Sequence, residues 1–334
     1  MALEYDALLK GCLTREEAEA IISLNDLPNE LLEAVGKLRR ESGNGEIRFY
    51  YPIPHFPNVS VTGASCALSC KHCGGHYLAG MRNADTPLKL KELCERLDRD
   101  GGVGVLVSGG SDLHGRVPLE RFYDTLRWVK ENTELIINVH TGLLDREQAE
   151  ELASMEIDIV SVDVVGCDET IKRVYGLDAT VTDYAETLRS LEDADVSNIV
   201  PHICVGLDFG QIRGEARALG VIQESDPEVI VILGLIPTMG TPMEGLAPPS
   251  SLDISRVVAA ARLMCPEAGI AIGCMRSRTD KARVERLAIT AGADRIVLPA
   301  NSTVQDAINE GFAVKHLDGC CAIPRSLEHL ALRG

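Results

Sequence analysis

Short apolar runs rich in β-branched residues alternate with amphipathic stretches through most of the chain. Segments such as LKLKELCERLDRD and REQAEELASM, which lie between the runs, carry apolar residues at helical spacing. Short strands that are apolar throughout and separated by helices are typical of a parallel sheet covered on both faces. The pattern predicts strands at residues 57–62, 103–107, 135–140, 157–163, 199–206, 229–236, 269–274 and 294–299.

Eight strand–helix units predict an α/β fold, with a (β/α)8 TIM-type barrel as the first choice. In such a barrel the chemistry lies at the carboxyl ends of the strands, so the residues after each run are the candidates for function. A doubly wound parallel sheet with a second, smaller domain is the alternative.

The two ends of the chain are expected to lie outside the barrel. Thr14 precedes a helical run with Glu17 three residues on, which is the spacing of a capping box. A second helix is expected between Asn29 and Gly43. We therefore predict a helical extension at residues 1–50, the barrel at 51–305 and a C-terminal tail at 306–334.

Composition narrows the function classes. The chain has 334 residues, 45% of them hydrophobic, and a formal net charge of −17, which disfavours nucleic acid and anionic membranes as partners. It has no apolar run of about 18 residues and no basic start followed by an apolar stretch. We expect a soluble, cytoplasmic enzyme, in which the 11 cysteines are reduced thiols or metal ligands.

Three cysteines follow the first predicted strand in the segment VTGASCALSCKHCGG. Cys66, Cys70 and Cys73 can ligate three irons of a [4Fe-4S] cluster and leave the fourth iron open to a substrate's amino and carboxylate groups. A zinc site or unligated thiols are the alternatives. His72 and His76 are close in sequence, but no second cysteine pair with zinc-finger spacing follows.

The spacing Cys-x3-Cys-x2-Cys after a first barrel strand resembles the signature of the radical S-adenosylmethionine (radical SAM) superfamily. The resemblance implies a radical SAM barrel in which Cys66, Cys70 and Cys73 hold the catalytic cluster and S-adenosylmethionine binds to it. Members usually carry an aromatic residue before the third cysteine, where this chain has His72. This difference concerns packing against the adenine more than ligation.

The resemblance also implies cofactor contacts at the ends of the following strands. The element SGGSD looks like the family's Gly-Gly-acid motif for the methionine amino group, with an inserted serine. Polar pairs on the third and fourth strands are expected to face the same mouth, and later glycine and proline positions to admit the adenine. The predicted cofactor-binding residues are Gly109, Gly110, Ser111, Asp112, Asn138, His140, Ser161, Asp163, Gly206 and Pro237.

The wider sequence resembles biotin synthase-like proteins. The segment TVTDYAETL lacks the arginine expected to hold the methionine carboxylate, for which Lys172 or Arg173 is a substitute. The segment IAIGCMRSR resembles the region where biotin synthase places an arginine ligand on a second cluster, which makes Arg276 the counterpart. An ordinary ion pair is the alternative for Arg276.

Several cysteines recur at positions expected near the barrel mouth, among them Cys167. If the tail folds over the mouth, an auxiliary iron–sulfur cluster has candidate ligands in Cys204, Cys274, Cys320 and Cys321. The alternative is that these are small apolar core residues. That alternative is the prediction for Cys12, Cys94 and Cys265, which lie in helical segments.

A second cluster is what sulfur insertion needs, so we predict a lipoyl synthase-like enzyme that adds sulfur to an octanoyl chain. The expected partners are an electron donor such as ferredoxin or flavodoxin, a second radical SAM protein and a lipoyl-carrier substrate protein. A biotin synthase-like mutase, a methylase or a metallocofactor maturase is the alternative without sulfur donation. A non-catalytic iron–sulfur or zinc scaffold protein is the alternative from another class.

Overall fold

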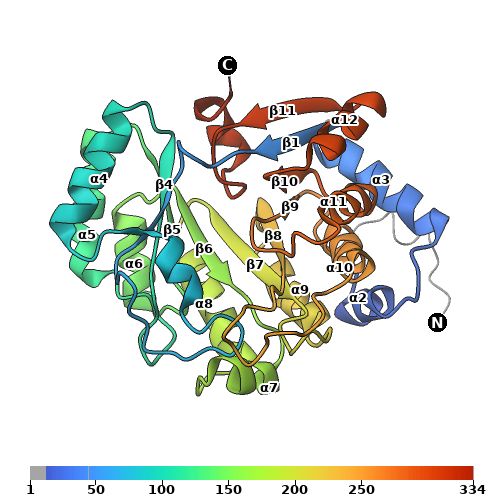
Figure 1. Ribbon diagram of the computed structural model, residues 1–334, viewed down its shortest axis with the longest axis horizontal. Helices are drawn as coiled ribbons and strands as arrows, with labels where there is room; N and C mark the ends of the chain where they lie inside the picture. The colour runs from blue at the N-terminus through green and yellow to red at the C-terminus, as the bar shows by residue number, and fades with distance from the viewer. Residues whose placement is uncertain (1–12, 44, 334) are drawn as a thin grey trace.

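The computed structural model describes residues 13–43 and 45–333, and in it one curved sheet of 11 strands is lined on its outer side by helices (Figure 1). All neighbouring strands in this sheet run parallel. The eight predicted strands are confirmed as β2 (Asn58–Ser60), β4 (Gly104–Ser108), β5 (Ile136–His140), β6 (Ile159–Asp163), β7 (Ile199–Val205), β8 (Val229–Gly234), β9 (Gly269–Ile272) and β10 (Arg295–Val297).

Helices connect successive strands, as the alternating pattern predicts for a TIM-type fold. The helices that cover the sheet are α4 (Pro87–Arg99), α5 (Tyr123–Asn132), α6 (Arg146–Ser154), α8 (Val181–Asp193), α9 (Glu215–Gln223), α10 (Ser251–Met264), α11 (Lys281–Thr290) and α12 (Asn301–Asn309). Short turns of helix lie in the loops: η1 (His76–Gly80), η2 (Glu120–Phe122), α7 (Asp168–Thr170), the π-helical η3 (Ile171–Tyr175) and η4 (Arg325–Leu330).

The sheet contains three strands beyond the predicted eight. β1 (Glu46–Tyr50) pairs with β10, and β11 (Ala313–Leu317) pairs with β1 in turn, while β3 (Arg82–Asn83) extends the other edge beside β2. Within residues 13–43 and 45–333 no pairing joins β2 to β10. The barrel is therefore open at the seam where a closed barrel would join its first and last strands.

The N-terminal helices pack against the side of the barrel. α2 (Arg15–Ile22) contacts α9 and α10, and α3 (Asn29–Gly43) contacts α10 and α11 (Figure 1). The predicted capping box is confirmed, since the Glu17 N–H donates to Thr14 Oγ1 at 3.3 Å and the Thr14 N–H donates to Glu17 Oε2 at 2.8 Å.

A separate apolar cluster fills the inner side of the barrel at the amino ends of the strands. Ile136, Ile159 and Val229, which begin their strands, pack there with Cys321 and Ile323 of the C-terminal tail. The expectation that the tail folds over the mouth is therefore wrong: it closes the opposite end of the barrel, which we call the floor.

Buried charges hold the tail in the floor. Arg295 donates through Nη1 to the carbonyl of Ile323 at 2.6 Å and to the Tyr50 hydroxyl at 2.7 Å. Glu328 pairs with Arg48 Nε at 2.6 Å and with Arg295 Nη2 at 3.2 Å. Because these partners come from β1, β10 and η4, the ion pairs join the two ends of the chain.

Candidate active site

The cysteine loop crosses the carboxyl ends of the strands, directly after β2. The Ala67 N–H donates to the carbonyl of Ser111 at 2.8 Å, and the Lys71 N–H donates to the carbonyl of Val174 at 2.8 Å. The loop is thereby tied to the turn after β4 on one side and to η3 on the other. These backbone bonds fix the loop at the mouth, where the chemistry of a TIM-type barrel is expected.

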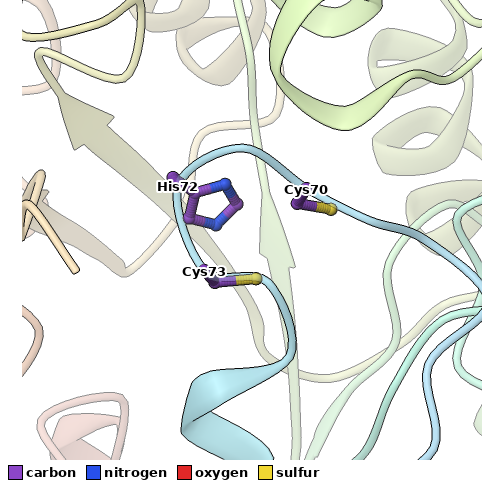
Figure 2. Close-up of side chains that lie close together, drawn as sticks. All are labelled: Cys70, His72 and Cys73. Carbon is purple, nitrogen blue, oxygen red and sulfur yellow. The ribbon is translucent and has the colours of Figure 1, made fainter. Parts of the chain in front are cut away.

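Two of the three thiols lie close together beside an imidazole. The sulfurs of Cys70 and Cys73 and a ring nitrogen of His72 all lie within 4.8 Å of one another (Figure 2). A hydrogen bond between the two thiols lowers the pKa of Cys73 well below its ordinary value and raises the pKa of Cys70 above its own. A sulfur-rich group of this kind suits iron.

The third thiol is held by the glycine turn. The Ser111 N–H donates to Cys66 Sγ at 3.3 Å, and the Gly110 N–H donates to Thr62 Oγ1 at 2.7 Å. A Cβ on Gly110 would overlap the carbonyl oxygen of Ser65 and the backbone of Cys66. The turn can therefore lie this close to the cysteine loop only because residue 110 is glycine.

A cavity of about 250 Å³ opens between the cysteine loop and the strand ends. All three cysteines line it, together with Gly109, Gly110, Ser111, His140, Asp163 and Tyr175. The three thiols and the bare glycine backbone fit a [4Fe-4S] cluster with S-adenosylmethionine beside it. The predicted residues that line the cavity are brought together by the fold, while their contacts to a cofactor stay predictions.

Polar side chains line this cavity and continue below it on the inner faces of three strands. His140 Nε2 lies 3.6 Å from Asp163 Oδ2, and the His140 ring stacks on His202 with centroids 5.1 Å apart. One layer deeper, Ser161 donates to Asn138 Oδ1 at 2.9 Å. The barrel interior is therefore polar at its centre, and the paired amide and hydroxyl of the deeper layer are both buried.

The pKa values of the two histidines in this layer are shifted in opposite directions. Burial opposes a charge on His140, but the carboxylate of Asp163 outweighs it and raises the pKa of His140. Burial, followed by the neighbouring charge of His140, lowers the pKa of His202 to about 4. His202 Nδ1 lies 3.0 Å from the carbonyl of Val200. A carbonyl oxygen can only accept a hydrogen bond, so Nδ1 carries the proton of the neutral ring and Nε2 carries the lone pair.

Several predicted cofactor residues lie apart from the cavity. Asp112 accepts the N–H groups of His114 at 2.8 Å and Arg116 at 2.9 Å, so its carboxylate orders its own loop. Gly206 donates its N–H to buried Glu215 at 2.9 Å. Pro237 does not line the cavity but precedes Thr238, and neither Asp112 nor Gly206 lines it.

The family of the chain follows from two consecutive matches. Residues 60–211 match the model of the Radical SAM superfamily, and residues 232–312 match that of the Biotin and Thiamin Synthesis associated domain. A biotin synthase from Synechococcus sp. (strain CC9605) is 24% identical over 294 residues, which cover 85% of this chain and 84% of the relative. The chain is a biotin synthase-like radical SAM protein.

A biotin synthase from Prochlorococcus marinus is 30% identical to this radical SAM protein over 184 residues, which cover 54% of the chain and 53% of the relative. HydG, a maturase of the [FeFe]-hydrogenase, superposes with a TM-score of 0.69 at 16% identity and covers 93% of this chain and 74% of its own. Methylornithine synthase (PylB) superposes with a TM-score of 0.68 at 20% identity, and the superposition covers 93% of this chain and 96% of the synthase. At these identities the two structures support the fold alone.

The candidate auxiliary ligands of this radical SAM protein come from different parts of the fold, and Cys274 is exposed. Cys204 lies on β7 and Cys274 follows β9, while Cys320 and Cys321 lie in the tail. Asn138 Nδ2 lies 3.9 Å from Cys320 Sγ. Across residues 13–43 and 45–333, only the group at Cys70 brings three metal-ligating atoms within 4.8 Å of one another. The auxiliary ligand set stays a prediction.

Arg276 lies in a buried ion pair. It donates through Nη2 to Glu285 Oε1 at 2.5 Å and to the carbonyl of Val297 at 2.9 Å, and through Nη1 to the carbonyl of Gly273. Glu285 also accepts from the Thr303 hydroxyl at 2.7 Å. The structure therefore favours the alternative in which Arg276 is structural.

The remaining cysteines and basic residues have simpler surroundings. Cys94 and Cys265 are buried in the apolar core, which confirms that prediction, and Cys12 lies outside the described residues. Cys167 is partly exposed just before α7.

Arg173 lies 3.4 Å from the buried carboxylate of Asp208. Lys172 is exposed on η3.

Four residues that shape the site were not among those predicted from the sequence. Tyr77 lines the cavity, and its hydroxyl lies 2.6 Å from Thr238 Oγ1, which ties the cysteine loop to the loop after β8. Tyr175 packs against His72, and His202 packs against His140. His202 could have been predicted from the sequence, because a histidine inside an otherwise apolar strand faces either a hydrogen-bond partner or a site.

Within the described residues, no helix is long and apolar enough to cross a lipid bilayer.

Proposed function

We propose that this radical SAM enzyme inserts sulfur into an unactivated carbon of an octanoyl chain, as a lipoyl synthase-like protein. The observation that carries the proposal is the position of Cys320. This residue comes from the far end of the chain, yet its thiol reaches the polar centre of the barrel at Asn138 Nδ2. A sulfur atom below the cavity is where a substrate radical formed above it could be trapped.

The surroundings of Cys320 suit both sulfur chemistry and a hydrocarbon. A hydrogen bond from the Cys321 thiol, outweighing the effect of burial, lowers the pKa of Cys320 to about 7. Leu106 and Leu233 are partly buried in the same inner cluster as Cys320, and they provide an apolar surface for an acyl chain.

The mouth residues supply the radical chemistry. Cys66, Cys70 and Cys73 would hold the cluster, which would supply the electron for reductive cleavage of S-adenosylmethionine and so the radical chemistry at the substrate carbon. The Gly109–Gly110 turn lines the cavity beside the cysteines, and its glycines let it pack against Thr62 and the cysteine loop. The loop tie between Tyr77 and Thr238 narrows the mouth and helps to exclude water from the reacting atoms.

The proposed partners follow from this chemistry. One electron enters for each cleavage of S-adenosylmethionine, so a low-potential donor such as ferredoxin or flavodoxin is required. An octanoyl chain attached to a carrier protein is the proposed substrate, and a second radical SAM protein is the proposed partner in the two-step addition of sulfur.

The polar layer inside the barrel favours a second candidate function. Asp163 and the stacked rings of His140 and His202 form a site for hydrogen bonds and charge, which suits a small polar substrate better than an acyl chain. The second candidate is therefore a radical rearrangement, fragmentation or maturation reaction that needs no donated sulfur. On this reading Cys320 and Cys321 are parts of the floor.

Iron and sulfide counting separates the two candidates. Wild-type protein, a Cys320→Ala/Cys321→Ala variant and a Cys94→Ala control would be reconstituted anaerobically, and 5′-deoxyadenosine and thiolated octanoyl product would be measured. Sulfur insertion predicts about two four-iron clusters in the wild type and in Cys94→Ala, but one in the double variant. It also predicts that the double variant still cleaves S-adenosylmethionine but forms no thiolated product. One cluster in all three proteins would favour the second candidate.

A further inference from the structure

The imidazole of His72 occupies a defined place between two of the cluster ligands. A ring nitrogen lies within 4.8 Å of both sulfurs of Cys70 and Cys73, and Figure 2 shows the ring on the inner side of the loop between them. His72 also lines the cavity assigned to the cofactors. The imidazole is therefore positioned to contact whatever the two thiols bind.

Neighbouring residues fix the orientation of this ring. Tyr175 packs edge-on against His72, with centroids 5.3 Å apart and ring planes at 65°. The backbone of Lys71, the preceding residue, donates to the carbonyl of Val174 at 2.8 Å. Both contacts come from η3, so the π-helical turn holds the imidazole against the cysteine loop.

One ring nitrogen of His72 lacks a hydrogen-bond partner. Nδ1 is buried and has no hydrogen-bond partner among the described residues. Buried polar atoms in folded proteins nearly always have a partner. A ring nitrogen of His72 lies within 4.8 Å of the thiols of Cys70 and Cys73. A sulfur of the cluster or of its ligands is therefore an acceptor that this imidazole can reach.

We propose that His72 donates its Nδ1–H to a sulfur of the primary cluster or of its cysteine ligands and thereby raises the cluster's reduction potential. Reduction adds one electron, and a hydrogen bond to sulfur stabilises the added negative charge. His72 is a positioning residue in this role, because it acts on the cluster and not on the substrate. The inference concerns electron entry and is independent of the substrate assigned to the enzyme.

The test is a potentiometric titration of the reconstituted cluster, with dithionite as the one-electron reductant and electron paramagnetic resonance as the readout. The variants are His72→Phe, which keeps an aromatic ring without a donor, and His72→Gln, which keeps an N–H donor. His76→Phe is the matched control, since His76 is an exposed imidazole on the same loop. Iron content would be measured for each protein.

The proposal predicts that His72→Phe lowers the reduction equilibrium constant about tenfold, equivalent to about 59 mV for a one-electron couple. His72→Gln should retain most of the wild-type potential, and His76→Phe all of it. Equal potentials in the wild type and His72→Phe would overturn the proposal, as would an equal shift in His76→Phe. Loss of iron from both His72 variants but not from His76→Phe would make His72 a metal ligand and would also overturn it.

Discussion

The two ends of the barrel differ in what their buried polar groups contact. At the floor, Arg295 and Glu328 are buried, and each lies against an opposite charge that the chain itself provides. At the mouth, His72 keeps a buried nitrogen without a partner, and all three cluster thiols line an open cavity. The charges of the floor are paired within the chain, although Arg48 Nη1 and Arg295 Nε have no hydrogen-bond partner among the described residues, whereas the mouth arranges its thiols around an open cavity.

This difference shows how stability and function are divided along each strand. The amino ends pack the apolar tail and the ion pairs that join the two ends of the chain. The carboxyl ends place thiols, glycines and histidines around a cavity. Substitutions at the floor should therefore act mainly on the free energy of unfolding, and substitutions at the mouth mainly on cofactor binding.

The largest effect on stability is expected at the floor from Glu328→Gln. The substitution removes the negative charge that Arg48 and Arg295 share. Breaking one side of a buried ion pair costs about 3–5 kcal/mol, because it leaves an uncompensated charge. Urea unfolding should show a loss of this size, while the iron content per folded molecule stays at the wild-type value. Unchanged stability would mean that the floor does not depend on its ion pairs.

The second prediction concerns pH and Glu215, whose carboxylate supports the loop after β7 at the mouth. Burial raises the pKa of Glu215 to about 7 from 4.5. The folded state therefore holds this proton more tightly than the unfolded chain, and the associated stability is present below pH 4.5 and is lost as the pH rises through 7. The difference between these two pKa values corresponds to about 3 kcal/mol in the free energy of unfolding.

Glu215→Gln keeps an acceptor for the Gly206 N–H without the titration. The variant should gain stability relative to the wild type as the pH rises from about 5 to 8. Denaturant unfolding at a series of pH values measures the difference. A constant gap between the two proteins across this range would show that Glu215 does not titrate there.

Gly110→Ala should weaken cofactor binding at the mouth with a smaller effect on folding. The added methyl group would overlap the carbonyl of Ser65 and move the cysteine loop. Disturbing the residues that support metal ligands typically costs about 10–100-fold in metal affinity or activity. The iron affinity of the variant during anaerobic reconstitution, compared with that of the wild type, measures this loss. Wild-type affinity in the variant would show that the loop can shift without consequence.

The smallest effect is expected from Tyr77→Phe, which removes one hydrogen bond between two mouth loops. The hydroxyl of Tyr77 lies 2.6 Å from Thr238 Oγ1. A hydrogen bond of this kind contributes about 1 kcal/mol. Hydrogen exchange of the loop after β8 should become faster by up to about fivefold, as this energy implies, while global unfolding changes little. Unchanged exchange would mean that the two loops are not coupled.

The sequence was sufficient to predict the barrel strands, because each one is a short, mostly buried and largely apolar run in a chain where such runs alternate with helical stretches. It was insufficient for β1 and β11. In β1 the segment EIRFY carries charged residues, and its partner β11 lies more than 260 residues away. A strand whose pairing is set by such a distant segment carries a weak local signal.

The site shows the same division. The cysteine triplet was predicted from its spacing, because all three thiols belong to one loop whose position follows from β2. The location of the tail could not be predicted in this way. Neighbouring cysteines at 320 and 321 gave no indication of which end of the barrel they enter, since this depends on Arg295 and on Glu228, which accepts the Arg325 N–H at 2.6 Å.

The central claim is that the mouth of this barrel performs radical SAM chemistry. Its most direct test is 5′-deoxyadenosine release by anaerobically reconstituted protein with dithionite and S-adenosylmethionine, compared with a Cys70→Ser variant. The account predicts release by the wild type and none above background by the variant, with both proteins folded by circular dichroism. Equal release from the two proteins, or none from a wild type that carries its four-iron cluster, would contradict it.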